Sequence, residues 1–373
     1  MNLAKLLIFQ HMLLVCALGN QSKIHTIGVV LPLTGRDSAY GTSIQKGILT
    51  AELAINRAGG IKGHKLNIVF VDDRSGRSSA LDGYKGLVQM HKPIAIIGGI
   101  TTESALAIAP MAERHKIPTL SPTATGDGVT EKSRYLFRVC FTNRFQGTAL
   151  ARLAIEHLGI RRAAILVDSS DPYSQGISEN FRKTFQSRGG SVVAQESLQL
   201  SAAEVEKVLS AIKSKKPQAV VLATHYERVA SMAHQMKKVG LRAVLLGGDS
   251  WDTFILPRDH ASDLDGSYYV THFSPDEQAP QVRNFVSEFK KVHSQIPMAF
   301  SALGYDALKM IASAIERAKD VSTEQIRNAL SEIRNFPGVT GYITVNKSRN
   351  TTKSAVVMQI ADGGVQYIRS IPP

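Results

Sequence analysis

The chain has 373 residues, of which 43% are hydrophobic and 20% charged, so it is long and apolar enough to bury the cores of two ordinary domains. This composition excludes a disordered protein. The formal net charge of +13 would suit a nucleic-acid-binding protein, but the lysines and arginines are spread over predicted helices and no nucleic-acid-binding motif occurs. We therefore expect a solvated basic surface and no nucleic-acid partner.

The first residues have the pattern of an export signal. A lysine precedes an apolar run that ends in the small residues Ala17 and Gly19, so residues 1–19 are predicted to be a signal peptide that directs the protein to the periplasm. Apolar runs that end in cysteine also occur in bacterial lipoproteins, so Cys16 is an alternative site for a lipid anchor. No later stretch approaches the roughly 18 to 20 apolar residues of a membrane span. The second cysteine, Cys140, is the only one beyond the signal, so no internal disulfide is expected.

After the signal, short β-branched runs alternate with segments of helical periodicity, which is typical of βα units with parallel strands. The first round predicts strands at 25–33, 64–73, 93–99 and 117–122 and helices at 42–60, 78–91 and 102–116. The second round predicts helices at 143–159, 171–190, 202–215 and 227–240 and strands at 162–168, 191–198, 219–225 and 243–249. Two such rounds predict an α/β fold with two Rossmann-like lobes, each built on an open parallel sheet.

The C-terminal part of the chain departs from this alternation. Helices are predicted at 280–295, 299–320 and 322–335, and closing strands at 341–346 and within 353–370. A purely tandem pair of domains would not need such a tail. We therefore expect these helices to return to the first lobe and the chain to cross an interlobe hinge several times.

Catalytic signatures are largely absent from the sequence. There is no Walker phosphate loop, no dinucleotide-binding glycine motif, no His-Glu-x-x-His, no Cys-x-x-Cys and no Gly-x-Ser-x-Gly. The eleven histidines have no metal-ligand spacing. The sequence therefore predicts no metal, no cofactor and no enzymatic activity, although a triad of Ser, His and Asp from distant segments stays open.

Polar and aromatic side chains gather where predicted strands end. Ligands of open α/β sheets bind at these carboxyl ends, beside helix N-termini with unpaired N–H groups. Thr101 and Thr102 follow one strand and could either cap the next helix or bind an anion. The further candidates are Tyr40, Ser121, Thr123, Thr125, Tyr173, Asp249 and Trp251. Each alone is typical of a turn or cap, but hydroxyls on one lobe opposite a carboxylate and aromatic rings on the other suit a small zwitterion.

The sequence resembles the type I periplasmic solute-binding proteins of the leucine/isoleucine/valine-binding branch, which serve ATP-driven amino-acid importers. The resemblance covers essentially the whole chain after the signal. The matching segments include IGVVLPLTGRDSAYG at 27–41, AINRAGGIKGHKLNIVFVDD at 54–73, IIGGITTESALAIAPMAERHKIPTLSPTAT at 96–125, FRVCFTNRFQGTALA at 137–151 and DPYSQG at 171–176. Their order along the chain makes chance agreement improbable.

The resemblance implies a role for each matching polar residue. Thr102 would present its hydroxyl and N–H to the α-carboxylate of the ligand, assisted by Thr125. The main-chain oxygen of Thr123 and the carboxylate of Asp249 would accept the α-ammonium, at a position where the branched-chain binders commonly have glutamate.

The resemblance also assigns the aromatic residues. Tyr40 and Tyr173 would cover the ligand from the two lobes, and Trp251 would line the pocket for its side chain. His225, beside Tyr226, falls where relatives often have tyrosine, and this departure weakens a specific assignment to leucine.

The family's fold implies a division of the chain into two discontinuous lobes. Lobe 1 would contain residues 23–139 and 272–347, and lobe 2 residues 140–271 and 352–373, with hinge crossings near Arg138–Phe141, Val270–Phe273 and Val345–Lys353. The implied function is a monomeric, non-enzymatic receptor that captures an amino acid or related amide and delivers it to the permease of an ABC importer. The alternatives are a ligand-sensing regulatory subunit of the same fold and an extracytoplasmic hydrolase.

Overall fold

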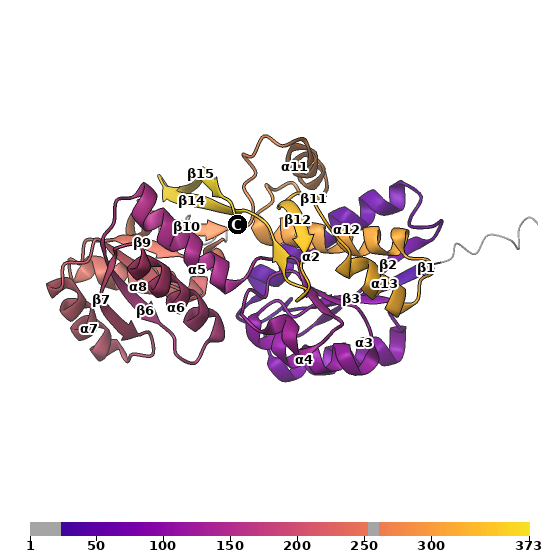
Figure 1. Ribbon diagram of the computed structural model, residues 1–373, viewed down its shortest axis with the longest axis horizontal. Coiled ribbons are helices and arrows are strands. Elements are labelled where there is room, and N and C mark those ends of the chain that lie inside the picture. The colour runs from indigo at the N-terminus through magenta and orange to yellow at the C-terminus, as the bar shows by residue number, and fades with distance from the viewer. Residues whose placement is uncertain (1–23, 253–260) are drawn as a thin grey trace, which may run out of the picture.

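Two lobes lie side by side along the long axis of the protein (Figure 1). The computed structural model describes residues 24–252 and 261–373. The predicted signal peptide at 1–19 and Cys16 lie outside the described residues. Within those described ranges, no helix combines the length and the apolar composition of a membrane span.

Lobe 1 is built on a five-stranded parallel sheet with the strand order β2-β1-β3-β4-β5. The strands are β1 (Ile24–Leu31), β2 (Lys65–Asp72), β3 (Ala95–Gly98), β4 (Thr119–Ser121) and β5 (Leu136–Arg138). Successive side chains of a strand point to opposite faces of the sheet. Accordingly, Val29 of β1 contributes to the apolar core on one face and Val30 to the core on the other.

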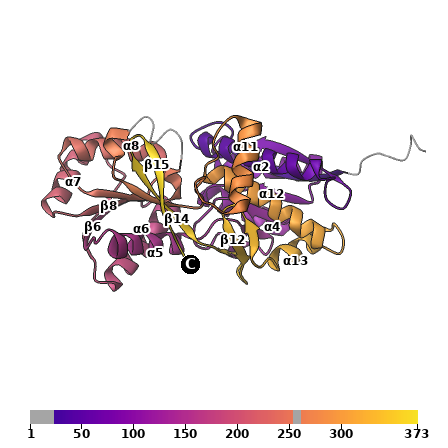
Figure 2. The same ribbon diagram turned by 90° about the horizontal axis from the view of Figure 1, so that it is seen from above.

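Helices cover both faces of this sheet. On one face lie α3 (Arg77–His91) and α4 (Thr102–His115). On the other lie α2 (Ser38–Arg57) and two helices from the C-terminal part of the chain, α12 (Ala299–Arg317) and α13 (Thr323–Ser331). A further C-terminal helix, α11 (Pro280–His293), packs against α2 (Figure 2). The C-terminal helices therefore return to lobe 1, as expected from the sequence.

The α2 and α12 backbones approach each other unusually closely. A Cβ atom on Gly47 would lie 1.8 Å from the backbone oxygen of Ser301, and one on Gly304 would lie 2.4 Å from the backbone oxygen of Ile44. Real Cβ atoms essentially never come so near to another heavy atom. Both helices thus need glycine at this crossing.

Lobe 2 is built on a seven-stranded sheet with the order β15-β14-β10-β9-β8-β6-β7. The strands are β6 (Arg162–Val167), β7 (Ser191–Ser197), β8 (Ala219–Leu222), β9 (Val244–Gly247), β10 (Tyr268–Thr271), β14 (Ala355–Ala361) and β15 (Gly364–Ile371). Strands β6 to β10 are parallel and repeat the strand order of lobe 1, whereas β14 and β15 form an antiparallel edge hairpin.

The helices of lobe 2 also form two layers. One layer contains α5 (Asn143–Arg152), which continues as a π-helical turn at Leu153–His157, and α6 (Pro172–Ser187). The other contains α7 (Ala202–Ser214) and α8 (Tyr226–Lys238). Short helices lie at Val129–Lys132, Asp249–Trp251 and Ala261–Leu264.

The chain passes between the lobes three times. It leaves lobe 1 between β5 and α5, returns between β10 and α11, and leaves again through a small antiparallel sheet of β11 (Phe336–Gly338), β12 (Gly341–Val345) and β13 (Thr351–Thr352) before β14. The predicted fold class, two α/β lobes with open parallel sheets, is confirmed. The residue boundaries predicted for the lobes stay a prediction.

Candidate functional site

Helix α4 begins directly after β3, at a turn that requires glycine. Gly99 has a φ of +73°, and a Cβ there would lie 2.7 Å from the Cα of Ala105. Thr101 is the N-cap residue, because its Oγ1 accepts from the Ser104 amide at 3.1 Å and the Ser104 hydroxyl accepts from the Thr101 amide at 3.1 Å. The Thr101 hydroxyl is thus used by the helix end. The amides of Thr102 and Glu103, in the first turn of the helix, have no intrahelical acceptor and are suited to an anion.

Two hydroxyls at the end of β4 and in the loop that follows it form hydrogen bonds to the same turn. Ser121 Oγ donates to the backbone oxygen of Gly99 at 2.6 Å, and Thr123 Oγ1 donates to that of Ile100 at 2.6 Å. Both side chains are buried. Their hydroxyls therefore hold the loop in place, and only the backbone of Thr123 stays available for its predicted role.

Thr102 and Thr125 lie together where this loop meets the start of α4. Thr102 Oγ1 accepts from the Gly126 amide at 3.1 Å. Thr125 is 1% exposed, yet its Oγ1 has no hydrogen-bond partner within the described residues. A buried hydroxyl without a partner costs free energy. Thr125 is thus the lobe 1 side chain that a ligand would satisfy.

Asp249 lies in lobe 2, just after the carboxyl end of β9. Its side chain is almost fully buried. Oδ1 accepts from Gln146 Nε2 at 2.9 Å and from the Tyr173 hydroxyl at 3.0 Å, and Oδ2 lies 3.0 Å from His272 Nε2. Burial of a carboxylate requires such donors. A carboxylate accepts about four hydrogen bonds, so three donors leave room for one more N–H.

His272 supports Asp249 from the second hinge passage. Its ring is fully buried and stacks on Phe141 with the ring centroids 3.8 Å apart. Burial lowers the pKa of His272 from 6.5 to about 4, although the bond to Asp249 acts in the opposite direction. The ring is therefore neutral at pH 7 and acts on Asp249 as a hydrogen-bond donor, without adding charge.

Tyr40 of α2 reaches from lobe 1 to lobe 2. Its hydroxyl donates to the backbone oxygen of Ser250 at 2.7 Å and lies 3.4 Å from the Tyr226 amide. Its ring stacks on Phe300 of α12 at a centroid distance of 4.5 Å. Burial raises the pKa of Tyr40 and of Tyr173 well above the usual range, so both keep their hydroxyl protons.

His225 precedes α8 and packs between these two tyrosines. Its ring stacks on Tyr173 at 5.3 Å and lies 6.2 Å from the Tyr40 ring. Nε2 is 3.5 Å from Asp171 Oδ2, and Nδ1 is buried without a partner within the described residues. Burial lowers the pKa of His225, but the Asp171 carboxylate raises it and the net shift is upward.

Trp251 lies apart from this group. Its ring is 1% exposed, belongs to the apolar core beneath α7 and α8, and is 6.4 Å from the Tyr269 ring. Direct contacts join Tyr40, Tyr173, His225 and Asp249, and Asn143 links the Thr125 backbone to the Tyr173 backbone. We call these four residues, together with Thr102 and Thr125, the cleft group. Thr101, Ser121 and Thr123 border it, and Trp251 does not reach it. The binding roles of all these residues stay predictions.

Three members of this neighbourhood were missed in the sequence, namely Gln146, His272 and Phe300. Gln146 lies in the predicted helix 143–159 and His272 in a predicted hinge segment, and at both places a polar residue gives no signal of its own. Phe300 follows the helical periodicity of α12 like any core residue. Within residues 24–252 and 261–373, no three His, Cys, Asp or Glu side chains are arranged to hold a metal.

A family model described as "Periplasmic binding protein" matches residues 25–364. The chain belongs to this family. This periplasmic binding protein is 25% identical over 295 residues to Leu/Ile/Val-binding protein homolog 3 of Brucella melitensis, a match that covers 79% of each chain.

Solved structures agree with this assignment. A leucine-binding protein from Thermotoga maritima has 31% identity and a TM-score of 0.87, with 94% of this periplasmic binding protein and 99% of that chain covered. The branched-chain amino acid transporter substrate-binding protein of Streptococcus pneumoniae, in complex with isoleucine, has 28% identity and a TM-score of 0.87, with coverage of 94% and 100%.

These comparisons confirm the predicted resemblance to the leucine/isoleucine/valine-binding branch. They also confirm that the periplasmic binding protein is a solute-binding protein of the class that serves ABC transporters, and not an enzyme.

Proposed function

We propose that this periplasmic binding protein captures a single amino acid between its lobes and delivers it to the permease of an ABC importer. It works in the periplasm as a monomer, after export by the signal peptide at 1–19 or with a lipid anchor on Cys16. The names of its relatives support this proposal, because they mention binding of leucine, isoleucine or valine.

The unpartnered Thr125 hydroxyl is the observation that carries the proposal. It is buried beside Thr102 and the positive end of the α4 dipole, which together favour a carboxylate. Across the cleft, Asp249 is a buried anion with room for one more donor, as an ammonium would supply. Asn143 links the two sides of the site. Its backbone amide donates to the backbone oxygen of Thr125 at 2.7 Å, and its Nδ2 donates to the backbone oxygen of Tyr173 at 3.2 Å.

The proposal is tested by isothermal titration calorimetry of the mature protein with leucine, isoleucine, valine, threonine and alanine. Thr125→Val keeps the shape of the side chain and removes only the hydroxyl. We expect it to weaken binding of the best ligand by about 10- to 100-fold, the value of a hydrogen bond to a charged group. The melting temperature of the ligand-free protein should not fall, because the change removes a buried hydroxyl that has no partner among the described residues.

The matched control is Ser178→Ala in α6. The Ser178 hydroxyl is also buried without a partner within the described residues, but it lies outside the cleft group. Its removal should leave affinity unchanged. The proposal fails if no amino acid binds, or if Thr125→Val and Ser178→Ala have the same affinity as the wild type.

A further inference from the structure

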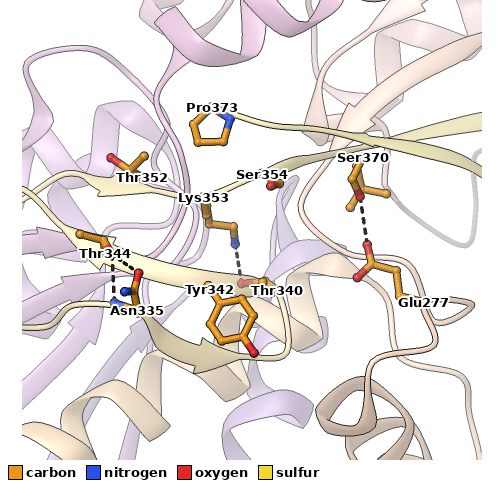
Figure 3. Close-up of a pocket in the computed structure, with 12 residues that line it drawn as sticks. Glu277, Asn335, Thr340, Tyr342, Thr344, Thr352, Lys353, Ser354, Ser370 and Pro373 are labelled. Carbon is orange, nitrogen blue, oxygen red and sulfur yellow. Dashed lines mark hydrogen bonds between the residues drawn. The ribbon is translucent and has the colours of Figure 1, made fainter.

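A pocket lies at the third passage between the lobes, between the small β11–β12–β13 sheet and the β14–β15 hairpin (Figure 3). Its volume of about 490 Å³ is in the range of small-molecule sites, roughly 300 to 1,000 Å³. We call it the hinge pocket, and its lining includes Glu277, Asn335, Thr340, Tyr342, Lys353 and Val356. None of these residues belongs to the cleft group.

Lys353 places a buried ammonium at this pocket. The residue is 2% exposed and lies between β13 and β14, in the third passage between the lobes. Its Nζ donates to Thr340 Oγ1, and Figure 3 shows the side chain directed at Thr340. An ammonium has three N–H donors, and Thr340 is the one acceptor found for it among the described residues.

The carboxylate of Asp306 is linked to the Lys353 ammonium through the Thr340 hydroxyl. Asp306 of α12 is buried and accepts from the Val339 amide at 2.9 Å, from the Thr340 amide at 2.9 Å and from the Thr340 hydroxyl at 2.6 Å. Thr340 thus relays between the carboxylate and the ammonium. Burial lowers the pKa of Lys353 to about 8, with Asp306 opposing the shift, so the ammonium is still mostly charged at pH 7.

Glu277 brings a carboxylate to the same pocket from the second passage between the lobes. It is half-buried, and its Oε1 lies 3.4 Å from the Ser370 hydroxyl of β15. Burial raises its pKa. A simple anion in this pocket would be repelled by Glu277 and a simple cation by Lys353, whereas a molecule with both charges would meet a partner at each end.

We propose that the hinge pocket binds a second small zwitterion, with its carboxylate at Lys353 and its ammonium at Glu277. The Tyr342 ring, which is exposed, supplies apolar surface for a short aliphatic group. Because Tyr342 belongs to β12 and Val356 to β14, the walls come from both sides of the third passage. A ligand here is therefore linked to the angle between the lobes. The proposal does not depend on what the cleft binds.

Equilibrium dialysis of the full-length mature protein with labelled glycine, L-alanine and L-leucine tests this site. We expect binding that survives Thr125→Val in the cleft and that Glu277→Gln weakens at least about tenfold, the loss of one charged hydrogen bond. Lys353→Met should have the same effect. Because Lys353 is buried and its variant could misfold, Glu277→Gln is the decisive change. The exposed residues Glu332 and Lys347 supply the controls Glu332→Gln and Lys347→Met, which should change nothing.

Ligand analogues with one charge sharpen the test. Compared with L-leucine, 4-methylpentanoate lacks the ammonium and 3-methylbutylamine lacks the carboxylate, so each should bind the hinge pocket at least about tenfold more weakly. The proposal is overturned if none of the three amino acids shows binding that Glu277→Gln weakens. A failure of the cleft proposal looks different, because it removes the binding that depends on Thr125 and leaves this one.

Discussion

Asp249 shows what a sequence can and cannot predict about a single residue. Its position after a buried strand and its acidic side chain were sufficient to predict it as a site residue. Its partners were not predictable, because Gln146 is 103 positions away along the chain and His272 is 23. The sequence also did not reveal that the hydroxyls of Thr101, Ser121 and Thr123 bond to the backbone. Nor did it reveal that the Thr125 hydroxyl has no partner in the part of the chain that the structure describes.

At this scale we predict that His272 makes stability depend on pH. Its pKa is about 4 in the folded protein and 6.5 in the unfolded chain, so the unfolded chain binds more protons between these values. The free energy of unfolding should therefore fall as the pH decreases from 6.5 to 4. His272→Gln keeps an N–H donor for Asp249 and removes the titration, so the fall should be smaller by roughly 3 kcal/mol, at 1.36 kcal/mol per pKa unit.

Urea unfolding of both proteins at several pH values measures this difference. Asp73 and Asp252, whose pKa values burial raises to about 6 and about 7, titrate in or close to the same pH range, and both proteins contain them. The informative quantity is therefore the wild-type value minus the variant value. Parallel pH profiles for the two proteins would show that His272 does not titrate as described.

Among the secondary-structure elements, long helices and buried strands were predictable from periodicity, and short or irregular ones were not. Helix α2 begins at Ser38, four residues before the predicted start, and the predicted helix 143–159 changes to a π-helical turn at Leu153. Strands β11 and β13 have three and two residues, too few to show alternation. Tertiary pairing with β12 defines them, and that pairing is not local information.

The crossing of α2 and α12 gives a prediction for Gly47. Replacement by alanine should destabilise the protein by about 1 to 3 kcal/mol, because the new Cβ would overlap the Ser301 oxygen and force the helices apart. Gly86→Ala in α3 is the matched control, since its Cβ would meet only Met90 at an ordinary 3.5 Å. That variant should be more stable by about 0.4 to 1 kcal/mol. Thermal unfolding that ranks the two variants in the opposite order would contradict the described packing.

For the whole molecule, the repeated strand–helix alternation predicted two lobes, and the C-terminal helices predicted the return of the chain to the first. The angle between the lobes was not predictable, because it depends on a few contacts between distant residues. The bond from the Tyr40 hydroxyl to the Ser250 backbone oxygen joins positions 210 residues apart and connects the two lobes directly.

We predict that Tyr40→Phe shifts the ligand-free protein toward an open form. Loss of one hydrogen bond of about 1 kcal/mol changes the ratio of closed to open molecules by roughly fivefold. Distances between spin labels on α3 and α7, measured by pulsed electron resonance, report the shift. Tyr367→Phe is the control, because that hydroxyl contacts Ser370 within its own strand. Identical distance distributions for Tyr40→Phe and the wild type would show that the Tyr40–Ser250 hydrogen bond does not stabilise the closed form.

The return of α12 to α2 also has a consequence for the order in which the protein is made. The apolar face of α2 is completed only by residues 299–317, which the ribosome adds after every parallel strand of lobe 2. The core of the first lobe to be synthesised is thus completed only after the parallel strands of the second lobe have been made. Until then the helical layer that contains α2 is incomplete, so we expect lobe 1 to fold late, after most of the chain has been made.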